Sequence, residues 1–171
     1  AAAASFSLTT PVKAIAGVSQ PLTVTARDIF GNLVTDYAGS VLLTSSDTQA
    51  ALLAPYTFTP TDSGTHSFQV TLKTAQVQTI TLTDAANAAI TATSPGIDVS
   101  AGAVVGFQFA TPSKITAGSP FTLKVTAVDA FGNKAKDYAG AVHFSSSAIA
   151  AGLPADCIFN IGDAGVHSFT V

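Results

Sequence analysis

The chain has 171 residues, of which 47% are apolar and 10% are charged, and its formal net charge is −3. Seven basic residues on a weakly acidic chain do not form the electrostatic footprint of a nucleic-acid-binding protein. No apolar run reaches the ~18 residues typical of a membrane-spanning helix, so no membrane-spanning segment is expected. The sequence contains no methionine, and we therefore expect a processed chain or a segment of a longer one.

The chain repeats itself at a constant offset of 101 residues. Residues 1–70 align with residues 102–171 without a gap, and 32 of the 70 aligned pairs are identical. The repeated stretches include ARDIFGN and TDSGTHSF, which return as AVDAFGN and GDAGVHSF. A period of this length is the size of one β-sandwich domain rather than of a solenoid coil. We therefore predict two domains, 1–101 and 102–171.

Alternation of apolar and polar residues predicts β-strands through both copies. In chain order, the alternating segments of the first copy are 5–8, 22–27, 41–43, 56–58, 66–72, 80–82 and 97–99. Turn signals such as FGN, AGS, TDSG and SPG separate these segments. Seven strands in one repeat predict an all-β fold of tandem Ig-like, seven-stranded β-sandwiches, with strands named A to G in chain order.

The second copy ends at Val171 and has no counterpart of residues 71–101. We therefore expect the second domain to be truncated after strand E, with strands F and G missing. Those two strands lie beside strand C in the usual sandwich order, so strand C would be left as an open edge. Two explanations stay open: the polypeptide continues beyond Val171, or a neighbouring chain supplies the strands. The predicted assembly edge consists of Val142, His143, Phe144, Ser145 and Ser146.

The segments ITAGSPFTLKVTAVDAFGNKAKDYAGAVHFSSS and VTLKTAQVQTITLTD, with the pattern D-x-G-x-H-S-F, resemble the bacterial Ig-like repeats of large surface and adhesin-type proteins. The turn and strand signatures are similar to invasin- and intimin-type domains, and DSGTHSF with SPGIDV is similar to the filamin-type variant. The resemblance covers the whole chain. It implies an architectural role on the outside of a bacterial cell, although a fold alone does not define an activity.

Recurring aspartates raise calcium as a ligand. Asp28 and Asp36 return as Asp129 and Asp137, and loop carboxylates are typical ligands of calcium. The alternative is a turn role, in which Asp accepts backbone N–H groups while Gly or Asn supplies the left-handed residue. The sequence has no dense D-x-D-x-D loop, so we prefer the turn role and keep calcium as the alternative. No other cofactor or metal is expected.

Histidines and tyrosines that recur are predicted to belong to the framework. His66 and His167 share one repeat position, and we expect a hydrogen-bonded histidine at a sandwich edge because zinc needs three or four ligands. Tyr37 and Tyr138 are expected to cover the core with their rings and to leave their hydroxyl groups in water. The sequence has no nucleophile elbow, no H-E-x-x-H motif and no glutamate, so no enzyme and no catalytic residue is predicted.

Together these features predict a structural module of a bacterial extracellular filament or cell-surface stalk. Its partners would be copies of itself, assembled by domain stacking and by inter-chain strand complementation. The alternatives are an adhesin or ligand-binding stalk module that contacts a glycan or host surface, and an accessory domain of a large secreted protein. A copy-specific charged or aromatic cluster would favour binding, and the largest divergence between the copies is LLAPYT against LPADCI.

Overall fold

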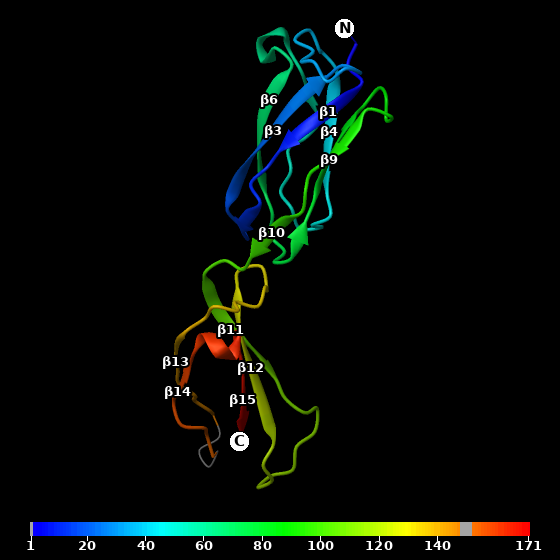
Figure 1. The fold of residues 1–171 in the computed structure, drawn as a ribbon. Helices are drawn as coiled ribbons and strands as arrows, with labels where there is room; N and C mark the ends of the chain where they lie inside the picture. Colours follow the sequence, from blue (N-terminus) through cyan, green and yellow to red (C-terminus); the bar gives the residue numbers. More distant parts are fainter. Residues whose placement is uncertain (1, 148–151) are drawn as a thin grey trace. The chain divides into compact units, whose positions relative to one another are not determined.

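The computed structural model describes residues 2–147 and 152–171. The chain divides into two compact units, Ala1–Ser100 and Ala101–Val171, which Figure 1 shows as ribbons. Apart from two single-turn 3-10 helices, η1 (Pro60–Asp62) and η2 (Ile161–Asp163), the regular structure of the described residues is β-strand. No helix in the described part of the chain is long and apolar enough to cross a membrane. The predicted all-β, Ig-like sandwich class is confirmed.

One layer of the first unit is an antiparallel sheet in the order β1-β3-β6. Its strands are β1 (Ser5–Thr9), β3 (Ser19–Arg27) and β6 (Thr65–Thr71). Along β3, the side chains of Leu22, Val24 and Ala26 are fully buried, whereas the threonines between them are half-buried. This period of two arises because successive side chains of a strand point to opposite faces of its sheet.

The other layer of the first unit is built on the antiparallel pair β4 (Ser40–Ser45) and β8 (Ile80–Asp84). The strand orders are β5-β4-β8-β9 and β2-β10-β7. The additional strands are β2 (Lys13–Ile15), β5 (Tyr56–Thr57), β7 (Val77–Gln78), β9 (Thr91–Thr93) and β10 (Ile97–Ser100). Strand F therefore corresponds to β7 and β8, and strand G to β9 and β10. Their inward side chains close the core, because Ile80, Leu82, Ile97 and Val99 are all nearly inaccessible to solvent.

The second unit repeats the first layer and part of the second. One antiparallel sheet has the order β11-β12-β15, and a separate hairpin pairs β13 with β14. The strands are β11 (Val104–Ala110), β12 (Thr122–Asp129), β13 (Gly140–Val142), β14 (Cys157–Phe159) and β15 (Val166–Thr170). The register is that of the first unit, since Phe107 opposes Ala127 as Phe6 opposes Ala26. Val125, Val142 and Phe159 form its buried core cluster.

A buried tyrosine joins the two layers of the first unit. The Tyr37 hydroxyl donates a 2.5 Å hydrogen bond to the Asp84 carboxylate on β8, and the ring packs edge-on against Phe6 and Phe58. The expectation that this hydroxyl lies in water was wrong for Tyr37, because the inward phase of β8 places a carboxylate beneath it. Burial and the neighbouring carboxylate both raise the pKa of Tyr37. The glycine of the D-Y-A-G motif, Gly39, leaves room for the ring, since a Cβ there would collide with the Tyr37 hydroxyl.

We predict that Tyr37→Phe weakens the pairing of β4 with β8, because Asp84 loses a buried donor. The expected loss is about 1–2 kcal/mol in the local free energy of opening, measured by hydrogen exchange of the β4 and β8 amides. Tyr138→Phe is the matched control, because the described residues offer the Tyr138 hydroxyl no hydrogen-bond acceptor. Equal effects of the two substitutions on their own units would contradict the assignment.

Candidate functional site

The recurring aspartates build turns. Asp28 Oδ1 accepts the backbone N–H groups of Phe30 and Asn32 at 2.9 and 2.8 Å, and Asp28 Oδ2 accepts the Asn32 side-chain amide at 3.1 Å. Gly31 has φ +83°, a left-handed conformation that glycine adopts without strain. Asp129 makes the same contacts to Phe131 and Asn133. The spacing D-x-x-G-N is therefore explained by a side-chain-capped turn.

Asp129 also accepts a backbone N–H from the segment that enters the second unit. The backbone N–H of Gly102, at the entry to the second unit, donates to Asp129 Oδ2 at 2.8 Å. Burial raises the pKa of Asp129, but the Asn133 side chain and the N–H groups of Gly102, Asn133 and Phe131 hold it below the usual value. The carboxylate is therefore an anchor for the chain that enters the second unit.

The hydrogen bonds to Asp28 and Asp129 engage the carboxylate oxygens that would coordinate calcium in the alternative interpretation. Asp36 and Asp137 are exposed, and in the described part of the chain no three His, Cys, Asp or Glu side chains gather as metal ligands do. The structure therefore brings none of the four calcium candidates into one cluster of carboxylates, and the turn role accounts for Asp28 and Asp129.

His66 belongs to a compact cluster at the start of β6. Its Nδ1 lies 2.7 Å from Asp62 Oδ1, and the Tyr56 hydroxyl donates to both Asp62 oxygens at 3.0 Å. The Tyr56 and His66 rings stack with their centroids 4.0 Å apart. The Thr59 backbone N–H, the His66 ring, and the hydroxyls of Thr59 and Tyr56 hold the pKa of Asp62 well below its usual value, against the effect of burial. The arrangement is that of a framework histidine.

The second unit keeps this histidine pair but changes its neighbour. His167 Nδ1 lies 3.2 Å from Asp163 Oδ1, whereas Cys157 occupies the position of Tyr56 in the repeat. Cys157 is a half-buried, free cysteine. Asp163 still accepts the Asn160 backbone N–H at 2.8 Å. The framework role of the histidine–aspartate pair therefore survives the loss of the stacked tyrosine.

The predicted assembly edge lies along β13 and the residues that follow it. In the first unit, β8 pairs with every residue from Val41 to Ser45, the counterparts of Val142 to Ser146. In the second unit β13 ends at Val142, so His143, Phe144, Ser145 and Ser146 lie outside a strand. The expected long edge strand is thus shorter than the sequence indicated, because the described residues provide no partner strand in the place of β8.

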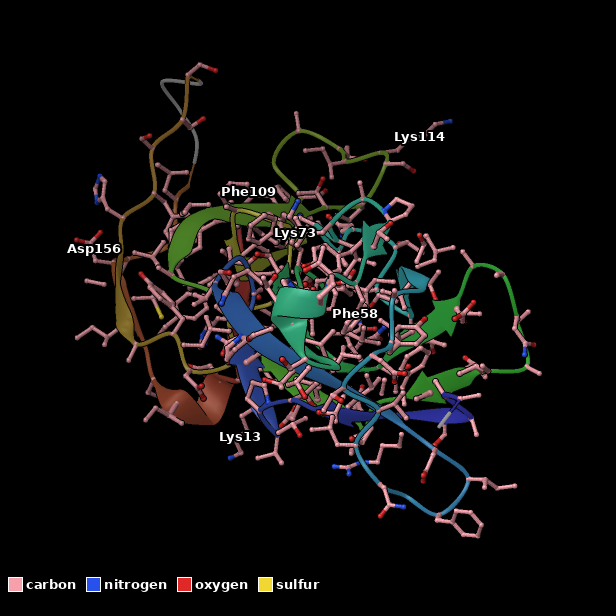
Figure 2. The ribbon with its side chains drawn as sticks, turned by 90° about the horizontal axis from the view of Figure 1, so that it is seen from above. Lys13, Phe58, Lys73, Phe109, Lys114 and Asp156 are labelled. Carbon is pink, nitrogen blue, oxygen red and sulfur yellow. The ribbon has the colours of Figure 1, made fainter. Side chains whose placement is uncertain are left out.

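The structure adds two features that the sequence reasoning missed. The first is an exposed pair that the first unit lacks: His143, directly after β13, has its Nδ1 2.6 Å from Oδ1 of Asp156, directly before β14. Figure 2 shows Asp156 at the surface of its unit and Lys114 extending from a second exposed segment. The second feature is Asp84, the buried acceptor of the Tyr37 hydroxyl. The sequence signal for it is that Asp84 alternates in phase with the inward residues Ile80 and Leu82 of the same strand.

No protein-family model and no curated protein matches the chain significantly. Among solved structures, domains 4–9 of the surface layer protein SbsC are similar at 21% identity, over 86% of this chain and 24% of that chain, with a TM-score of 0.41. Invasin, a bacterial integrin-binding protein, is similar at 20% identity over 80% of this chain and 28% of that chain, with a TM-score of 0.47. The native conformation of E. coli alpha-2-macroglobulin is similar at 13% identity, over 97% and 14%, with a TM-score of 0.48.

The chain spans about a quarter or less of the length of these proteins. At these identities and TM-scores the similarities transfer no ligand, partner or activity to the chain.

We predict that Asp129→Asn exposes the entry to the second unit. The substitution removes the charge and places an amide N–H either against the donors at Oδ2, which are the Gly102 N–H and the Asn133 side chain, or against the two backbone N–H groups at Oδ1. In both orientations the Gly102 N–H loses its charged acceptor. Hydrogen bonds to charged groups are worth about 1.5–3 kcal/mol, so the Gly102 amide should exchange roughly 10- to 100-fold faster. Asp28→Asn is the matched control and should leave Gly102 unchanged. Unaltered exchange at Gly102 in Asp129→Asn would exclude the anchor.

We also predict that acid destabilises both units. The carboxyl groups with folded-state pKa values below the usual one are Asp28, Asp47, Asp62, Asp84, Asp129 and Asp163. A carboxyl group whose pKa is lower in the folded than in the unfolded protein stabilises the fold at pH values above its unfolded pKa of about 3.9. This contribution to stability is lost as the pH falls through the folded-state pKa. The midpoint of thermal unfolding should be flat from pH 8 to 5 and fall below about pH 4. A midpoint that rises between pH 5 and pH 3 would contradict this assignment.

Proposed function

We propose that the chain is a structural module of a bacterial extracellular filament or cell-surface stalk. In this role it would act as a spacer and pack against copies of itself. The observation that carries the proposal is the constant 101-residue offset at which strands, capped turns and framework histidines return. In both units the recurring polar side chains bind their own framework, as Asp28, Asp129 and His66 do. A chain whose recurrent polar residues serve its folding is suited to an architectural role.

The outward face of the β5-β4-β8-β9 sheet supports packing against similar surfaces. Hydroxyl pairs cross the strands between Thr81 and Thr93 at 2.8 Å and between Thr83 and Thr91 at 3.0 Å. Ser40 and Thr57 form a third such pair at 2.6 Å. These paired hydroxyls carry no charge, so two such faces can approach without the repulsion that like charges would impose.

A binding role is the second candidate, because one copy-specific surface favours it. The exposed His143–Asp156 pair lies at the adjoining ends of β13 and β14, and Ile158 on β14 is also exposed. It falls in the region where the two copies diverge most. An adhesin or ligand-binding stalk module would use such a surface to contact a glycan or a host surface.

Immunogold electron microscopy of source cells tests the proposal, using antibodies raised against the 171-residue chain. Label in regular rows along filaments or across an outer layer is expected for an architectural module. Label confined to the cell interior would overturn it. Sparse label at the outer ends of surface projections, with glycan or host-cell binding that His143→Ala abolishes, would favour the adhesin alternative.

A further inference from the structure

Part of the core of the second unit lies at the surface. Val125, Ala127, Val142 and Phe159 are buried, like their counterparts in the first unit. In contrast, Leu22, Phe68 and Val70 are no more than 2% exposed, whereas their identical counterparts, Leu123, Phe169 and Val171, are half-buried. Phe144 is also half-buried and contacts Phe169 edge-on, with ring centroids 4.7 Å apart. We call Leu123, Phe144 and Phe169 the apolar floor of the second unit.

Two segments border this floor, residues 114–116 and residues 143–145, and both lie outside strands. Their counterparts in the first unit belong to β2 and β4. Residues 143–145 correspond to residues 42–44 of β4, which pair with β8. Residues 114–116 correspond to β2, which exists in the first unit as the parallel partner of β10. Ile115 is 58% exposed where its counterpart Ala14 is 6% exposed. Among the described residues, neither segment has the strand partner that its counterpart has in the first unit.

The strand pairing of the corresponding segments in the first unit indicates which kind of partner would fit between residues 114–116 and residues 143–145. In the first unit, the strand beside 41–45 is antiparallel and the strand beside 13–15 is parallel. The two added strands pair with each other, since β8 pairs with β9 and β7 with β10, both antiparallel. A single added strand would satisfy one margin and leave the other open. An antiparallel hairpin satisfies both and covers the apolar floor.

We propose that the apolar floor and its two margins bind a β-hairpin of the repeat's own type, with the sequence pattern of residues 71–101. This rests on the proposed function, in which copies of the repeat assemble with one another. The hairpin brings inward apolar residues at the positions of Ile80, Leu82, Ile97 and Val99 and an acidic residue at the position of Asp84. That acid accepts a hydrogen bond from the Tyr138 hydroxyl, as Asp84 does from Tyr37.

The direct test adds a synthetic peptide of residues 71–101 to the isotope-labelled 171-residue chain. We expect one peptide to bind per chain and the amides of residues 114–116 and 143–145 to exchange at least roughly tenfold more slowly. A peptide of residues 71–86, which carries only the first strand, should leave residues 114–116 unprotected. A full-length peptide with Leu82→Asp should not bind, because it places a charge on the apolar floor.

A double-mutant cycle tests the position of the hairpin. Tyr138→Phe in the chain and Asp84→Ala in the peptide should each weaken binding, and together weaken it no more than either alone. Additive losses would overturn the proposed register. Absence of binding, or protection confined to the first unit, would overturn the proposal itself. Concentration-dependent oligomers that the peptide cannot dissociate would also overturn it, because the apolar floor would then be covered by a surface of a second chain other than the hairpin.

This experiment is separable from the test of the proposed function. Peptide binding depends only on the apolar floor and its margins, whereas immunogold labelling depends only on where the protein is found. A chain that binds the hairpin but lies inside the cell would retain the inference and lose the architectural role. A surface-located chain that ignores the peptide would do the reverse.

Discussion

The pairing of β8 with β4 is the interaction on which the rest of the first unit depends. It holds all of β4 in a strand, and it places Ile80 and Leu82 over the inward residues of the other layer. It also positions Asp84 beneath Tyr37, which joins the layers through a buried hydrogen bond. The second unit shows the consequence of lacking this pairing in the described residues, because its strand C ends four residues earlier, at Val142, and its core is only partly covered.

Backbone pairing and side-chain burial are coupled in this fold. Residues 13–15 form β2 only where β10 lies beside them, and the same strand pair buries Ala14. Without the partner, residues 114–116 are exposed and irregular. Extended backbone is therefore maintained here by its neighbour, since an unpaired strand leaves its N–H and C=O groups to solvent and gains no packing.

The polar residues that recur are committed to turns and caps. Asp28 and Asp129 each satisfy several backbone donors, and Asp62 holds Thr59, Tyr56 and His66 together. These contacts satisfy backbone donors of the turns. The hydroxyl-lined sheet of the first unit and the copy-specific face of β13 and β14 lie apart from these contacts and are exposed.

The sequence by itself determined the all-β class, the repeat and most strand positions, because alternation and turn residues act locally and both recur at one offset. It also indicated that Asp28 and His66 belong to the framework. Other features depended on strand neighbours that are distant in sequence. The hydrogen-bond partner of Tyr37 lies 47 residues away in the sequence. The His143–Asp156 pair follows from the register of β13 with β14. The margin at residues 114–116 is recognised only by comparison with the pairing of β2 and β10 in the first unit. Tertiary structure decided these because sheet pairing joins residues that no local pattern connects.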